Sequence, residues 1–129
     1  MSFAKWVFRI AGVYGVLVLV PFYFLENDPR AVPPPPLTHP EYYYGFVGVG
    51  LAWQAAFLII SMDPLKYRWM MLPGIVEKVS FGAAVIWLYV LQRVDAHLLP
   101  ACAIDLTLGL LFLFSFFQVG KAREAGHGL

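Results

Sequence analysis

Residues 43–62 read YYGFVGVGLAWQAAFLIISM, a stretch without a single charged side chain. An α-helix needs about 20 apolar residues to cross the ~30 Å hydrocarbon core of a bilayer, because each residue advances it by ~1.5 Å. Stretches of similar length and character occur at residues 6–25, 70–91 and 98–119. We therefore predict an all-α, transmembrane four-helix bundle that forms one membrane domain over residues 1–129.

The composition excludes several classes of protein. The chain is 60% hydrophobic and 13% charged, whereas soluble domains carry about 25% charged residues. The four stretches leave no room for a soluble catalytic domain, so any activity must lie inside the bundle or on its loops. A net charge of +1 without a basic run gives no sign of nucleic-acid binding.

The basic residues predict how the bundle is oriented. Cytoplasmic segments of membrane proteins are enriched in lysine and arginine. With the N-terminus in the cytoplasm, six of the nine basic residues fall on the cytoplasmic side: Lys5, Arg9, Lys66, Arg68, Lys121 and Arg123. We therefore expect both termini inside (N-in/C-in). The outer loop at residues 26–41 then contains the run Pro33–Pro36, which favours a stiff polyproline II segment lying across the mouth of the bundle.

Small residues predict how the second helix packs. Lipid supplies no hydrophobic drive for helices to associate, so close approach at small side chains matters. Gly48, Ala52 and Ala56 recur at a spacing of four, with Gly45 one turn earlier. We expect this stripe to contact a neighbouring helix, either within the bundle or in a homodimer.

Ionisable side chains inside a membrane cost about 2.5–3.5 kcal/mol each on insertion scales, so each of them indicates a site. Glu77 lies ~10 Å below the inner boundary of the third helix, and Asp105 lies ~10 Å below the outer boundary of the fourth. Lys78 follows Glu77, and we expect it to extend to the inner interface. Gln54 lies near the middle of the second helix.

These residues admit three interpretations. In the first, a cavity binds a ligand and is lined by Trp53, Gln54, Glu77, Trp87 and Asp105. In the second, the charges form internal pairs, with Arg9 entering the membrane at a depth similar to Glu77 and forming a structural ion pair with it. In the third, the carboxylates handle protons or ions.

The sequence does not indicate a metal site or a cofactor. Cys102 is the only cysteine, and all three histidines lie outside the apolar centres of the four stretches. Haem ligation by two histidines within the bundle is therefore not supported. The sequence also lacks the zinc-protease, redox, nucleophile-elbow and phosphate-loop motifs. We predict no metal, and the cofactor, if one exists, is unknown.

Several short motifs resemble those of small uncharacterised four-span proteins of bacterial inner membranes: PEYYYGF at 40–46, LAWQ at 51–54, DP at 63–64, YR at 67–68 and EK at 77–78. The layout also resembles membrane proteins of the emopamil-binding (EXPERA) type. Gln54, Pro73 and Glu77 correspond in position to residues of that type, whose acidic side chains face a sterol-sized cavity. The catalytic acid and histidine pattern of its isomerase members is not recognisable here.

We therefore expect a small, non-enzymatic, multi-pass protein, with the resemblance favouring the bacterial inner membrane. Its role would be that of an accessory subunit of a membrane complex or a binder of a lipid-like apolar ligand. Its partners would be membrane lipid together with other membrane subunits or a second copy of the chain. The alternative is a proton-coupled transporter or membrane enzyme that uses Glu77 and Asp105.

Overall fold

The computed structural model describes residues 2–127 and is all-helical over that range. Four of its helices are long and apolar enough to cross a membrane, which confirms the expected fold class. Two of the spans begin with short 3₁₀ turns, and the first span ends with one. In chain order the elements are α1 (Ser2–Leu19), η1 (Val20–Phe24), α2 (Pro40–Met62), η2 (Arg68–Met70), α3 (Met71–Val90), η3 (Ala96–Leu98) and α4 (Leu99–His127).

The helix ends follow from local sequence. Pro40 is the first residue of α2, a position where the missing N–H has no helical partner in any case. Gln92 follows the end of α3 with a positive φ of 60°. Its N–H donates to the carbonyl of Tyr89 at 2.9 Å, and the N–H of Arg93 donates to the carbonyl of Leu88 at 2.8 Å. This pair of bonds is a Schellman motif, which normally places glycine where Gln92 stands.

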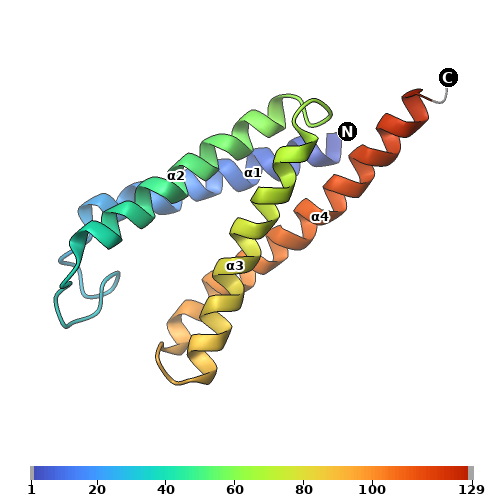
Figure 1. Cartoon of the computed structure of the whole chain (residues 1–129). Helices are drawn as coiled ribbons and strands as arrows, with labels where there is room; N and C mark the ends of the chain where they lie inside the picture. Colours follow the sequence, from blue (N-terminus) through green and yellow to red (C-terminus); the bar gives the residue numbers. More distant parts are fainter. Residues whose placement is uncertain (1, 128–129) are drawn as a thin grey trace.

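The four spans form two antiparallel hairpins that diverge from one another. In Figure 1, α1 lies along α2, and α3 lies along α4. The hairpins meet near the N-terminus and the turn at residues 63–67, which we call the termini end, and they separate toward the opposite, loop end. Although one turn joins α2 and α3, they diverge from it, and each packs mainly along its own hairpin partner.

Buried aromatic rings join the hairpins at the termini end. The ring of Phe8 on α1 stacks on Phe112 of α4 with centroids 4.1 Å apart, and Phe57 of α2 meets Phe112 at 4.9 Å. All three side chains are fully buried, together with Met71 and Val119. Such ring pairs contribute about 0.5–1.5 kcal/mol each beyond the area that they bury. This cluster therefore sets the point from which the hairpins diverge.

Glycines permit close packing within each hairpin, but not along the expected stripe. A Cβ atom added at Gly15 of α1 would overlap the side chain of Gln54, and one added at Gly82 of α3 would lie 2.5 Å from Leu106 of α4. In the expected stripe, Gly45 is exposed, and a Cβ at Gly48 would meet only the hydroxyl of Tyr23, at 3.5 Å. The close contact expected of this stripe is therefore not made at Gly45 or Gly48 within the bundle, while a homodimer contact stays a prediction.

Candidate functional site in the fork between the hairpins

A buried lysine connects two carboxylates where the hairpins separate. Lys78 of α3 is only 4% exposed. Its Nζ donates a hydrogen bond to Oδ1 of Asp105 on α4 at 3.3 Å, and it lies 3.7 Å from Oε2 of Glu77. Within the bundle, an ammonium group surrounded by carboxylates avoids most of the cost of an isolated charge.

The register of the α3–α4 hairpin explains this pairing. Gly82 lies against Leu106, and a Cβ at Gly109 would lie 3.5 Å from the Cβ of Lys78. Asp105 is four residues from Gly109, one helical turn toward the loop end, and a lysine side chain is long enough to cover that step. The expected separation of Glu77 and Asp105 by depth therefore does not keep them apart, because Lys78 reaches both.

Two of the predicted charge interactions are wrong. Arg9 does not pair with Glu77: its side chain is exposed, and its guanidinium lies 5.5 Å from the centre of the Trp6 ring. The face of α1 that packs inward carries Ala4, Phe8 and Ala11 instead. Lys78 does not extend to the interface either, because its partner Asp105 is within the bundle.

Above the Lys78 cluster, toward the loop end, all four helices line a cavity of about 310 Å³. Its walls are mainly apolar, with Val18, Leu19 and Phe22 on one side and Phe81 and Leu98 on the other. Its polar lining consists of Tyr14 and the side chains that the sequence singled out, together with the lysine: Gln54, Glu77, Lys78 and Asp105. The cavity is therefore amphipathic.

Two oxygen atoms at this cavity have no hydrogen-bond partner among residues 2–127. Gln54 is only 2% exposed, and its Nε2 donates to the carbonyl of Gly50 at 2.9 Å. Its Oε1 is buried without a donor, and Oε2 of Glu77 is buried without a hydrogen bond, although the ammonium group of Lys78 lies 3.7 Å away. Buried polar atoms are almost always hydrogen-bonded, so unpaired acceptors indicate a place where a donor can be received.

A second hollow, a groove of about 630 Å³, lies between α2 and α3. The groove and the cavity share four lining residues: Phe46, Gly50, Glu77 and Phe81. Trp53 lines the groove rather than the cavity. Trp87 lines neither and is 64% exposed, so its expected place in the ligand site is wrong.

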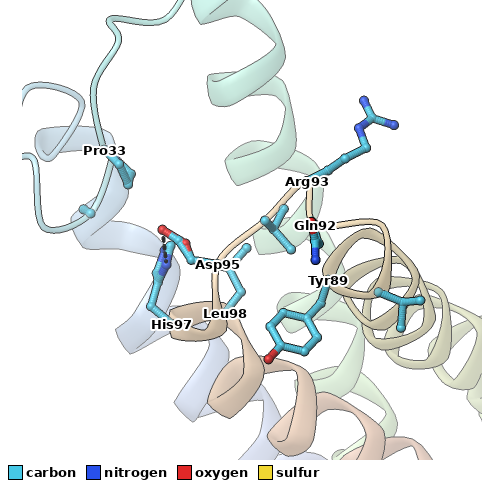
Figure 2. A pocket seen from close by; sticks show the side chains of 10 residues that line it. Pro33, Tyr89, Gln92, Arg93, Asp95, His97 and Leu98 are labelled. Atoms are coloured by element: carbon cyan, nitrogen blue, oxygen red, sulfur yellow. Dashed lines mark ion pairs between the residues drawn. The ribbon is translucent and has the colours of Figure 1, made fainter.

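A shallow pocket of about 860 Å³ lies at the loop end, where Ala31 and Pro33 approach the connection between α3 and α4 (Figure 2). His97 and Asp95 form an ion pair there, with Nδ1 and Oδ2 3.4 Å apart. Both side chains are substantially exposed, so the pair contributes little to stability. Ala31 also lines the cavity, which places the loop between α1 and α2 beside the loop-end mouth of the cavity.

The other reactive side chains among residues 2–127 do not form a second candidate site. No three histidine, cysteine, aspartate or glutamate side chains in this range lie close enough together to hold a metal ion. Cys102 is buried, and its thiol donates to the carbonyl of Gly82 at 3.2 Å. Comparison with known protein families, curated proteins and solved structures finds no match to this chain.

Proposed function

We propose that the protein is a multi-pass protein of the bacterial inner membrane that binds a lipid-like amphiphile in the fork between its two hairpins. The proposal describes a non-enzymatic binder, with both termini in the cytoplasm and the cavity opening toward the outer side. The layout shared with the emopamil-binding type, whose members have a sterol-sized cavity, is consistent with an apolar ligand.

The observation that supports this proposal most is the amphipathic lining of the cavity. Its volume, about 310 Å³, lies at the lower end of the ~300–1,000 Å³ range of small-molecule pockets. A polar head group with an N–H or O–H donor would satisfy Oε1 of Gln54 and Oε2 of Glu77. The carbon atoms next to the head group would contact Val18, Leu19 and Phe22.

A second candidate function is proton transfer through the two carboxylates. Lys78 lies within 4 Å of both Glu77 and Asp105, so a proton could be exchanged within one connected cluster. Proton uptake into proteoliposomes under an imposed potential would be measured with the unmodified protein and with Asp105→Asn. Uptake that Asp105→Asn abolishes would favour transport over simple binding.

Ligand binding can be followed through Trp53, which lines the adjoining groove. The other three tryptophans, Trp6, Trp69 and Trp87, are 58%, 61% and 64% exposed and can be replaced by phenylalanine. We expect bromododecanol, an alcohol with bromine at its free end, to quench Trp53 fluorescence saturably in lipid nanodiscs. Unlabelled dodecanol should compete with it.

A matched pair of substitutions separates specific binding from simple partitioning into the bilayer. Ala101 and Ala103 are both exposed residues of α4, but only Ala101 lines the cavity. Ala101→Phe should weaken saturable quenching strongly, whereas Ala103→Phe should not, and neither adds a tryptophan. Quenching that rises without saturation, and equally in both variants, would disprove the proposed binding site.

A further inference from the structure

We propose that the groove between α2 and α3 holds the hydrocarbon tail of the ligand while the cavity holds its head group. The ligand would then be a single-chain amphiphile that enters from the bilayer rather than from water. This inference rests on the proposed function and adds the place of the tail, the class of ligand and the route by which it arrives.

The groove and the cavity adjoin and share part of their lining. Phe46 and Gly50 of α2, and Glu77 and Phe81 of α3, line both of them. Glu77 therefore borders the groove as well as the cavity, while Oε1 of Gln54 and the Lys78–Asp105 pair belong to the cavity alone. A molecule whose head group contacts Glu77 can pass its tail from the cavity into the groove without crossing a helix.

The groove is mainly apolar and faces outward. Phe46 and Val49 line it and are 56% and 62% exposed, and Gly45 leaves further space beside them. The groove follows the line along which α2 and α3 diverge. In a membrane, such an apolar, outward-facing surface is in contact with acyl chains. A hydrocarbon tail is the occupant that matches both the surface and its surroundings.

Two aromatic rings lie at the junction of the two hollows. The rings of Phe46 and Phe81 come from opposite sides, with centroids 6.4 Å apart and planes inclined by 31°. Rings this close are in contact, so they narrow the junction, and a tail that enters the groove has to pass beside them. We therefore assign Phe46 and Phe81 to the selection of single-chain ligands.

The groove can be filled without disturbing the helices. A Cβ added at Gly45 meets nothing within 4 Å, and the same holds for Gly126, which is exposed near the end of α4. Gly45→Phe should therefore place a ring in the groove, and Gly126→Phe is its matched control. Both substitutions are made in the protein whose only tryptophan is Trp53. Binding of dodecanol and of hexanol is measured by their competition with bromododecanol.

We expect Gly45→Phe to weaken dodecanol binding about tenfold, the scale of an overpacked contact, because the long tail loses its path. Hexanol, short enough to stay near the head-group cavity, should bind unchanged, and Gly126→Phe should affect neither alcohol. Each alcohol is compared between two proteins in the same lipid, so its partitioning into the bilayer affects both measurements equally and does not change their ratio. Equal effects on both alcohols, or none, would disprove the tail site. Absence of saturable binding before any groove substitution would instead disprove the proposed function.

A cross-linking measurement tests the route independently. In a Cys102→Ala background, a bifunctional maleimide would join Phe46→Cys to Phe81→Cys, or Ala31→Cys to Leu98→Cys at the loop-end mouth of the cavity. Each protein is compared before and after cross-linking. The first cross-link should slow association of bromododecanol, and the second should leave it unchanged. Slowing by the loop-end cross-link alone would show that the ligand arrives from the aqueous side.

Discussion

At the scale of single residues, Lys78 has the largest electrostatic role. A charged side chain at membrane depth costs about 2.5–3.5 kcal/mol on insertion scales, and Lys78 is almost fully buried. Asp105 at 3.3 Å and Glu77 at 3.7 Å offset that cost. With two carboxylates around one ammonium, the cluster depends on Lys78 more than on either acid.

We predict that Lys78→Met destabilises the fold by about 3–5 kcal/mol, because removing one partner of a buried ion pair leaves the other charge uncompensated. Adding Asp105→Asn to Lys78→Met should recover much of the loss. Unfolding in detergent, followed by circular dichroism for both single variants and the double variant, would give the coupling energy.

Arg9→Gln is the control for this cycle, since its guanidinium is exposed on the ring of Trp6. We expect it to change stability by less than about 1 kcal/mol, as for other exposed charges. A loss as large as that of Lys78→Met would support the Arg9–Glu77 ion pair that the sequence analysis offered as one interpretation.

The sequence identified the polar members of the site but not their partners. Gln54, Glu77 and Asp105 stand out because each interrupts an apolar stretch, and all three line one cavity. Whether Lys78 faces Asp105, or Trp87 faces lipid, depends on the rotation of each helix about its axis. That rotation is set by contacts such as Gly82 against Leu106, which spacing along one helix does not reveal.

At the scale of secondary-structure elements, the glycines show where helices are in contact. Gly45 and Gly48 have the spacing typical of a packed face, yet the close contacts are made by other glycines, among them Gly15, Gly50 and Gly82. A helix that is apolar on all sides gives no periodic signal for its buried face. The number of helices and their approximate limits could thus be predicted, whereas the packed face of α2 could not.

We predict that Gly82→Ile lowers the thermal midpoint in detergent, while Gly48→Ile leaves it nearly unchanged. The added Cβ at position 82 would lie 2.5 Å from Leu106, whereas at position 48 it meets only the hydroxyl of Tyr23 at 3.5 Å. Overpacking of this kind costs about 1–3 kcal/mol. If Gly48→Ile lowered the thermal midpoint more than Gly82→Ile, the small-residue stripe of α2 would be a packed face after all.

The turn after α3 offers a stabilising substitution. Gln92 has φ of 60°, a left-handed conformation that costs an ordinary L-residue about 1–2 kcal/mol and glycine almost nothing. Gln92→Gly should therefore raise the free energy of unfolding by about 0.5–1 kcal/mol, after allowance for the greater flexibility of unfolded glycine. Gln92→Ala, which keeps the Cβ, should bring no such gain in a urea titration.

At the scale of the whole molecule, the decisive feature is that two hairpins share one contact region and then diverge. The aromatic cluster of Phe8, Phe57 and Phe112 holds them at the termini end, and the cavity lies beyond it, toward the loop end. Only a short turn joins α2 and α3, yet the two helices diverge from it. Their separation leaves the groove between them, which is the second part of the proposed site.

The orientation of the molecule determines which leaflet the open end of the fork faces, and labelling can establish it. Six of the nine basic residues lie at the termini end, including Lys66 in the α2–α3 turn, and cytoplasmic segments collect such residues. In a Cys102→Ala background, we predict that Pro34→Cys reacts with an impermeable maleimide in intact cells. Lys66→Cys should react only after permeabilisation, and both positions are exposed in the fold. Reversed labelling would place the loop end in the cytoplasm, and the fork would then open toward the inner leaflet.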